Sequence, residues 1–395
     1  MERRRVLGIV AILLPPLLYS FYRFSIGALV PAFEATYSIS DATAGGVISA
    51  SVGLVAIGVF GGGLLAQELG DVRTILLGLV IFTVSEAAVV AAQSLWEFSV
   101  FFFIASFGTG LVITPSYGVI ALLLPGRRGF AVSLISAAYS SGGFVGPSLA
   151  GYLLVYRGWD APFVALALIG AAFTVFFAAV LGRSRKAELS QSPISYAKAL
   201  ASRAIVALVV ADFFADLGFL VFVSWTPKYL ISAFAVSGGG TATIDSIFGI
   251  GVGLGGVGAL IAGVLFDRLG GKRSALLMGG LSGLSFAGLY LATPLSIALV
   301  LVLVAGFLSN SFWPLFTAMA QVSVPEGQVT SATSVVQTAG FIGAFIGPGL
   351  AGLIGGAVSS ALILTTVVPY AIFLFVILTR YQNPAAASRP NTTST

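Results

Sequence analysis

Long apolar runs separated by short polar loops constrain the fold of this chain more than any other feature. A membrane core of about 30 Å needs about 20 apolar residues per helix, and cutting the sequence at its polar loops on this basis gives twelve candidate spans. Only 8% of the 395 residues are charged, too few to cover a water-soluble protein of this size. The sequence therefore predicts an all-α integral membrane protein. The predicted spans are residues 6–31, 42–66, 73–92, 97–124, 129–155, 161–182, 204–231, 244–266, 274–293, 295–321, 330–355 and 358–379.

The second half of the sequence repeats the first. Matching residues lie 200 positions apart in the stretches 63–73 and 263–273, and the segment 146–151 matches 347–352 at a nearly equal offset. A single offset that links separate parts of the chain indicates a duplicated half. The matching residues of the first stretch are Gly63, Leu65, Leu69, Gly70 and Arg73. We therefore predict a six-helix bundle over residues 1–182, a cytoplasmic linker over 183–203, a second six-helix bundle over 204–381 and a disordered cytoplasmic tail over 382–395.

Lys and Arg residues gather on one side of the predicted membrane. If both termini are cytoplasmic, all 19 Lys and Arg residues lie on that side except Arg23, Arg157 and Lys228. Positively charged loops are retained in the cytoplasm, so the pattern predicts this topology, and we expect the plasma membrane as the location. The same asymmetry accounts for the net charge of +5 without a nucleic-acid partner.

One short charged loop joins the eighth and ninth predicted spans. It reads Gly263-Val264-Leu265-Phe266-Asp267-Arg268-Leu269-Gly270-Gly271-Lys272-Arg273. Together with the twelve spans and the duplication, this loop resembles the signature of the major facilitator superfamily of secondary transporters, and the resemblance covers essentially the whole chain. The copy in the first half departs from it, because Gln67 and Glu68 replace the Asp-Arg pair. The resemblance implies two pseudo-symmetric six-helix bundles around a central cavity, lined by the first, fourth, seventh and tenth spans, that opens to each side in turn.

Arg23 lies well inside a predicted span, whereas Arg73 and Lys228 fall at the ends of theirs. A guanidinium facing lipid costs at least about 2.5–3.5 kcal/mol, so Arg23 is expected to face the cavity, a carboxylate, or both. The resemblance implies a substrate contact, because several anion-transporting branches of the family carry an arginine at a similar place; a structural pair with an aspartate of the seventh span is the alternative. Further candidate substrate contacts in or near the lining spans are Tyr19, Tyr22, Tyr117, Asn310, Trp313 and Gln337.

Asp212 and Asp216 stand four residues apart in the seventh span, hence on one helix face. Two carboxylates on one apolar face repel and are poorly solvated, so at least one of them is expected to hold a proton near neutral pH. The pair is therefore our candidate for proton coupling. The alternative is that Asp216 only neutralises Arg23 while Asp212 reaches cytoplasmic water. Glu86 in the third span is either functional or snorkels to the outer interface.

A cytoplasmic gate is predicted from the signature loop. In the family's arrangement this loop approaches the cytoplasmic start of the fifth span when the inner side is closed. The candidate gating residues are Asp267, Arg268 and Arg273 in the loop and Arg127 and Arg128 at the start of the fifth span. We predict Asp267 as the main latch, because Gln67 replaces the aspartate in the first half.

Several function classes are excluded by absent residue types. The chain has no Cys and no His, which removes thiol chemistry and the commonest zinc ligands and proton relays. It also lacks the Gly-x-x-x-x-Gly-Lys-Ser/Thr segment that binds nucleotide phosphates. We therefore expect no enzyme, no cofactor and no metal site. The leading hypothesis is a monomeric, proton-coupled transporter of a small organic anion, with a carboxylate favoured. Efflux of apolar or cationic compounds by proton antiport, and a non-transporting membrane sensor on the same fold, are the alternatives.

Overall fold

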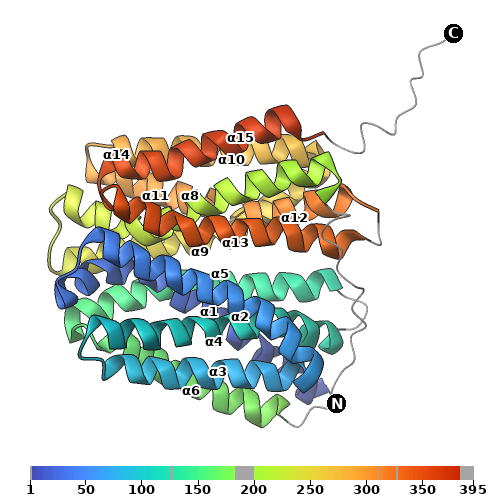
Figure 1. Cartoon of the computed structure of the whole chain (residues 1–395), viewed down its shortest axis with the longest axis horizontal. Helices are drawn as coiled ribbons and strands as arrows, with labels where there is room; N and C mark the ends of the chain where they lie inside the picture. Colours follow the sequence, from blue (N-terminus) through green and yellow to red (C-terminus); the bar gives the residue numbers. More distant parts are fainter. Residues whose placement is uncertain (1, 125–127, 183–199, 310, 326–327, 383–395) are drawn as a thin grey trace.

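Long helices running side by side along the long axis form the molecule (Figure 1). The structure is a computed structural model that describes residues 2–124, 128–182, 200–309, 311–325 and 328–382. The helices are α1 (Glu2–Tyr37), α2 (Asp41–Leu69), α3 (Asp71–Val90), α4 (Leu95–Leu123), α5 (Arg128–Arg157), α6 (Ala161–Leu181), α8 (Arg203–Ala233), α9 (Gly239–Leu269), α10 (Gly271–Leu291), α11 (Leu295–Ser309), α12 (Phe312–Val322), α13 (Val329–Leu353), α14 (Ser359–Leu362), the π-helical turn η2 (Ile363–Val367) and α15 (Val368–Arg380). Within the described ranges, eleven helical stretches are long and apolar enough to cross a membrane. With α5, they form the twelve-span all-α fold that the sequence predicts.

The helix limits differ from the predicted spans most clearly at α1. It continues beyond residue 31, through Pro31, to Tyr37. The rings of Phe33 and Tyr37 in its last turns lie 4.8 and 5.4 Å from the ring of Phe98 between centroids. This aromatic packing stabilises helical residues after a proline.

One further limit differs from the prediction. α9 begins at Gly239, five residues before the predicted limit of residue 244. The predicted tenth span, residues 295–321, agrees with a single candidate membrane span over Leu295–Val322, described as α11 to Ser309 and α12 from Phe312, with residue 310 outside the described residues. The Ser311 hydroxyl donates a hydrogen bond to the carbonyl oxygen of Leu308, and local bonds of this kind compete with helical ones.

Gly70 and Gly270, which match in the two halves of the sequence, have the same structural role. They end α2 and α9 and precede α3 and α10, with φ values of 88° and 80°. This region of backbone space strongly favours glycine. Each glycine therefore allows the chain to leave one helix and enter the next within a single residue, and the same device serves both halves.

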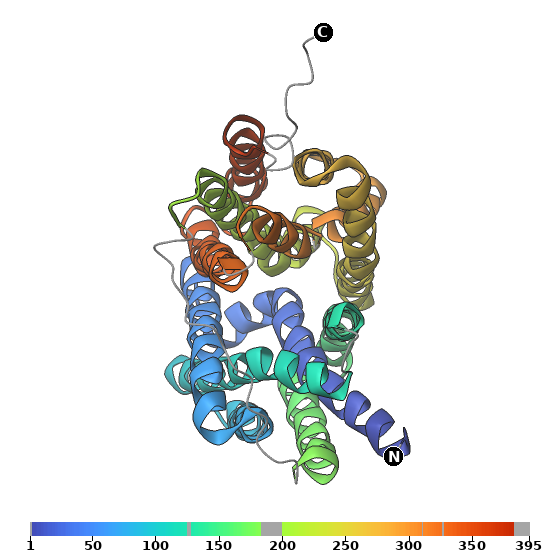
Figure 2. The same ribbon diagram turned by 90° about the vertical axis from the view of Figure 1, so that its right-hand side faces the viewer.

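The helices form two bundles, α1–α6 and α8–α15 (Figures 1 and 2). We call the end where α1 begins and α15 ends the terminal end, and the opposite end the distal end. Figure 2 views the terminal end, with α2 beside α13 and α5 beside α9. These two contacts, with that of α1 and α8, join the bundles. The predicted linker and tail fall mostly outside the described residues, so the domain limits stay a prediction.

The seam between the bundles is tight from mid-molecule to the distal end. In the pair α2 and α13, a Cβ atom at Gly45 would lie 3.2 Å from the Cα atom of Gly352. In the pair α5 and α9, a Cβ atom at Gly256 would lie 2.6 Å from the Cβ atom of Ser140, whereas one at Gly263, two turns nearer the terminal end, would meet nothing within 4 Å. The bundles are therefore closed against each other at the distal end, and α9 has no such contact at Gly263.

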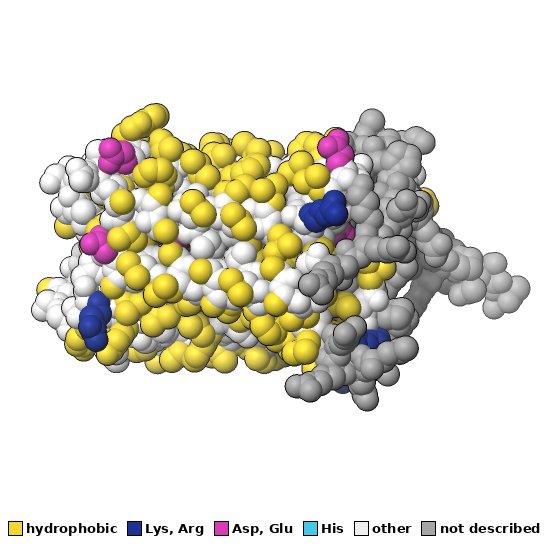
Figure 3. Space-filling model, turned by 90° about the horizontal axis from the view of Figure 1, so that it is seen from below, with side chains coloured by type: hydrophobic (Ala, Val, Ile, Leu, Met, Phe, Trp, Pro, Cys, Tyr) yellow, Lys and Arg dark blue, Asp and Glu magenta, His cyan; other side chains and the backbone are white. Residues whose placement is uncertain are grey.

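Hydrophobic side chains cover the middle of the molecular surface in the view of Figure 3, and most charged side chains on that face lie toward the two ends. Large apolar side chains such as Val84, Leu168 and Leu284 are more than half exposed. A protein in water rarely exposes so many of them. The surface has the distribution expected of a multi-pass membrane protein.

Candidate functional site

Arg23 lies near the middle of α1, at the seam between the bundles. Its Nη1 atom donates a hydrogen bond of 2.9 Å to the hydroxyl of Tyr19. Its Nε atom is buried and has no hydrogen-bond partner among the described residues. The guanidinium carbon lies 6.0 Å from the centroids of the Tyr19 and Phe24 rings. The carboxyl group of Asp216 on α8 attracts the charge of Arg23, and Tyr139 on α5 lies nearby, so residues of both bundles surround the guanidinium.

Asp212 and Asp216 on α8 face the same point on α13. A Cβ atom added at Gly340 would lie 2.6 Å from an oxygen of Asp216 and 2.7 Å from an oxygen of Asp212. Asp212 is 1% exposed, and its Oδ1 atom has no partner among the described residues. The glycine leaves room for both carboxyl groups, and the spacing prediction that they share one face is therefore met.

Two observations bear on the alternative interpretation of this pair, in which Asp216 only neutralises Arg23 and Asp212 reaches cytoplasmic water. The described residues contain no Arg23–Asp216 ion pair, since the two ion pairs found there both involve Lys228. Asp212 does not reach water, because it is buried. Arg23 and Asp216 therefore lie close enough to attract each other without neutralising each other in direct contact.

Tyr19, Tyr22 and Arg23 line one small cavity with residues of α2 and α8. The Tyr22 hydroxyl forms a 2.7 Å hydrogen bond with that of Ser106 and lies 3.2 Å from the carbonyl oxygen of Phe102, which fixes it against α4. The other lining residues are Ile26, Ile48, Ser51, Val52, Val55, Leu220 and Ser224. A molecule bound at Arg23 would therefore meet both bundles, as alternating access requires.

The remaining predicted substrate residues are placed less centrally. Tyr117 on α4 lies in the neighbourhood of Tyr19. Gln337 donates a 3.2 Å hydrogen bond to Thr317 of α12 and lies one turn from Gly340 on α13. Trp313 is 38% exposed, and Asn310 lies outside the described residues. The structure thus brings Tyr19, Tyr22, Tyr117 and Asp216 toward Arg23.

The predicted terminal gate is only partly described. Asp267, Arg268 and Arg273 are exposed, and none forms an ion pair within the described part of the chain. Arg127 lies outside the described residues, as does the side chain of Arg128. The gate therefore stays a prediction.

Glu86 does not snorkel to the interface, contrary to one of the two interpretations of the sequence. It is fully buried, and neither carboxyl oxygen has a hydrogen-bond partner among the described residues. It shares the buried face of α3 with Ile75, Leu79, Phe82 and Val89. This spacing of three and four residues places Glu86 on the core side of the helix. The same spacing is visible in the sequence and could have predicted the burial of Glu86.

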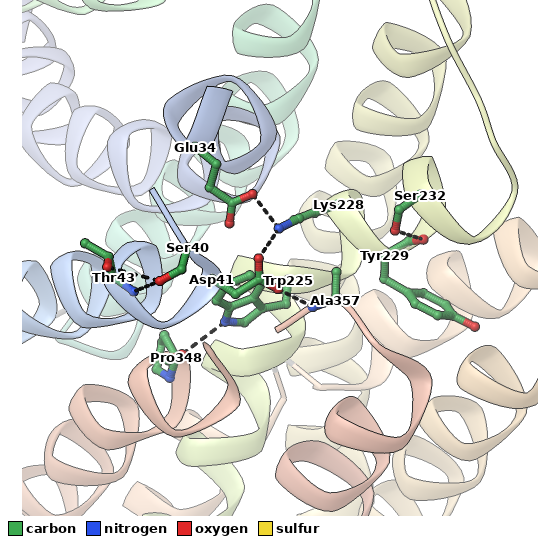
Figure 4. Close-up of polar contacts among 10 residues, drawn as sticks. All are labelled: Glu34, Ser40, Asp41, Thr43, Trp225, Lys228, Tyr229, Ser232, Pro348 and Ala357. Carbon is green, nitrogen blue, oxygen red and sulfur yellow. Dashed lines mark hydrogen bonds and ion pairs between the residues drawn. The ribbon is translucent and has the colours of Figure 1, made fainter. Parts of the chain in front are cut away.

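Sequence reasoning missed a cluster of charges at the distal end, shown in Figure 4. Lys228 of α8 donates to Glu34 of α1 and, over 2.6 Å, to Oδ1 of Asp41 at the start of α2. The other oxygen of Asp41 accepts from the backbone N–H of Ala357 at 3.4 Å. The Lys228 ammonium also lies 5.4 Å from the centroid of the Trp225 ring. We call Glu34, Asp41 and Lys228 the distal latch, because one cation of the second bundle holds two carboxylates of the first.

Replacing Lys228 by Met is expected to open the distal end. The side chains of Lys228 and Glu34 are 16% and 13% exposed, so the change leaves acids unpaired at a site with little water. Charge-assisted hydrogen bonds contribute about 1.5–3 kcal/mol, which corresponds to a shift of about 10- to 150-fold toward the open form. Distances between spin labels at Gln93→Cys and Thr293→Cys, which lie in exposed distal loops, should lengthen.

Arg157→Met supplies the matched control for this measurement. Arg157 is another distal cation, but it is exposed and forms no ion pair with the described residues. Its loss should leave the label distances unchanged. Equal distance distributions in Lys228→Met and the unmodified protein would show that the cluster does not hold the bundles together.

Comparison with known proteins agrees with this architecture. The family model described as Major Facilitator Superfamily matches residues 16–348. The gallate transporter of Pseudomonas putida is 26% identical, and the match covers 85% of this chain and 81% of that protein. The cis,cis-muconate transport protein of Acinetobacter baylyi is 24% identical, and the match covers 83% of this chain and 82% of that protein. The gentisate transporter of Corynebacterium glutamicum is 24% identical over 83% and 76%. A bacterial homolog of the human lysosomal transporter Spinster, solved inward-facing and occupied, superposes with a TM-score of 0.77 at 15% identity, covering 94% of this chain and 96% of that one.

Proposed function

Because the chain belongs to the major facilitator superfamily of transporters, we propose that it carries a small organic anion with a carboxylate group across the membrane, coupled to protons. The observation that carries this proposal is the guanidinium of Arg23. It is enclosed by both bundles, it lacks an ion-pair partner within the described residues, and its Nε atom has no hydrogen-bond partner there. A planar guanidinium with unused donors matches the two oxygens of a carboxylate.

The related transporters support the same class of substrate. Gallate, gentisate and cis,cis-muconate, after which they are named, share a carboxylate attached to an unsaturated carbon skeleton. Tyr19, Tyr22 and Ile26 beside Arg23 offer flat and apolar surfaces for such a skeleton. We therefore favour an unsaturated or aromatic carboxylate over a small saturated acid.

Asp212 and Asp216 are the proposed proton-coupling groups. They lie on the helix that faces Arg23, so the substrate charge and the proton would occupy neighbouring sites. A bound anion would compete with Asp216 for the attraction of Arg23, which favours uptake of a proton by the acid. Substrate and proton would then move together.

We propose that the terminal end lies in the cytoplasm, as the positive-inside asymmetry favours. We propose the plasma membrane as the location and a monomer as the working unit. In this orientation the distal latch closes the outer side. Asp267 is exposed and forms no ion pair with the described residues. This is consistent with an inner gate that forms only when the inner side is closed and the outer side is open.

Uptake by proteoliposomes tests the proposal. With an inward proton gradient, labelled gallate, gentisate or cis,cis-muconate should accumulate, whereas a lipophilic cation such as tetraphenylphosphonium should not. A second candidate function is efflux of cations by proton antiport. The observation behind it is the pair of acids on α8, which could bind a cation directly. Movement of the cation with no movement of any carboxylate would therefore replace our proposal with that one, and movement of neither would favour a sensor.

A further inference from the structure

Asp245 is a buried acid outside the site described above. It lies in the distal half of α9, where α9 crosses α5 of the other bundle. The side chain is 1% exposed, and its Oδ1 atom has no hydrogen-bond partner among the described residues. A Cβ atom added at Gly151 on α5 would lie 2.6 Å from the Cβ atom and 2.8 Å from the Cγ atom of Asp245. The carboxyl group is therefore pressed against the backbone of the opposite bundle.

No charge compensates this carboxyl group within the described residues. The titratable groups on the neighbouring parts of α5, α8 and α10 are Tyr152, Tyr156, Arg157, Lys228, Tyr229 and Tyr290, and α11 and α12 carry none. Lys228 is held by the distal latch. The hydroxyl of Tyr290 bonds to that of Thr226 at 2.9 Å, and that of Tyr229 to the carbonyl oxygen of Tyr290 at 3.2 Å. No described group forms a hydrogen bond or an ion pair with Asp245.

We propose that Asp245 is a proton-binding site that controls closure of the distal end. An unpaired carboxylate is too costly to bury, so Asp245 must bind a proton before α5 closes over it. When the bundles separate at this end, the carboxyl group meets water and releases the proton. Asp245 lies in the distal half of α9, so opening of the distal end is what brings it to water. The proton that binds Asp245 comes from the distal side and regulates closure of that end. It is distinct from any proton carried by Asp212 or Asp216.

The pH response of this site has a defined sign. The closed form holds one proton more than the open form, so acidification favours closure, by up to about tenfold for each pH unit. The distal latch responds in the opposite direction, because protonation of Glu34 weakens its attraction for Lys228. The contribution of Asp245 is therefore the difference between the unmodified protein and a variant that cannot titrate at this position.

Spin-label distances between Gln93→Cys and Thr293→Cys, measured in nanodiscs without substrate from about pH 5 to about pH 8, test the proposal. Asp245→Asn imitates the protonated acid at nearly the same size. At the acid end, its closed-to-open ratio should be nearest to that of the unmodified protein, because an aspartate in water is increasingly protonated toward low pH. At the alkaline end it should be more closed, by about tenfold for each pH unit over which Asp245 titrates. Asp245→Ala, measured alongside, should lose the same pH-dependent component.

Asp160→Asn is the matched control, since Asp160 is an exposed aspartate of the distal end and should leave the response unchanged. The measurements are repeated in Asp212→Asn/Asp216→Asn, where the effect of Asp245→Asn should persist. A difference between Asp245→Asn and the unmodified protein that is the same at every pH would overturn the proposal, and so would its loss in the double variant. Because no substrate is present, the outcome does not depend on what the protein carries.

Discussion

Arg23→Ala is expected to lower the affinity for the transported carboxylate by about 30- to 5,000-fold. Removing one partner of a buried, hydrogen-bonded charge pair costs about 2–5 kcal/mol, and each 1.4 kcal/mol is a factor of ten in affinity. Arg23 is held by Tyr19 and retains a buried Nε donor without a partner, so an anion can bind to donors that are already in place. Substrate binding to the purified protein, measured by calorimetry, gives the affinity directly.

Two further variants separate charge from geometry. Arg23→Lys keeps the positive charge but loses the planar pair of donors, so its affinity should fall between those of Arg23→Ala and the unmodified protein. Tyr19→Phe removes only the hydroxyl that accepts from Nη1, and it should cost less than either change of Arg23. If Arg23→Ala binds and carries the carboxylate normally, Arg23 is a structural residue and the anion site lies elsewhere.

The fold was largely predictable because each span depends on local sequence. Length and hydropathy locate a helix in a membrane without reference to its neighbours, and the recurrence of Gly70 at Gly270 marks a turn that glycine favours. The tail of α1 was missed for the opposite reason. Helix beyond Pro31 depends on contacts of Phe33 and Tyr37 with Phe98, which lies far away in the sequence.

The parts of the candidate site that lie on a single helix could be predicted from the sequence. The spacing of Asp212 and Asp216 places both on one face of α8, and the cost of a charge in lipid identifies Arg23. Contacts between the bundles have no such local signal. The partners in the distal latch, Lys228 and Glu34, are separated by 194 positions. Nothing in the sequence around Asp245 indicates that Gly151 covers it.

Asp216→Asn is expected to abolish accumulation of substrate driven by a pH gradient while exchange down a concentration gradient survives. If one proton enters with each substrate, a gradient of one pH unit supports about tenfold accumulation, and loss of the titrating group should reduce this to equality on both sides. Asp212→Asn should have a similar effect, because both acids meet at Gly340 and the charge on one governs protonation of the other. Asn keeps the size of Asp, so the space beside Gly340 stays filled and the cavity at Arg23 stays intact.

The comparison that decides this coupling uses the same proteoliposomes with and without a gradient. Glu68→Gln is a suitable control, because Glu68 is an exposed acid at the terminal end of α2 and its loss should change neither mode. Downhill exchange must be retained in Asp216→Asn, since its loss would mean that the acid is needed for binding. Accumulation that is unchanged in both Asp216→Asn and Asp212→Asn would remove these residues from the coupling mechanism. Because Arg23 attracts Asp216 without a direct ion pair, an arriving carboxylate can take over that attraction, and this exchange of partners is the physical link between substrate and proton.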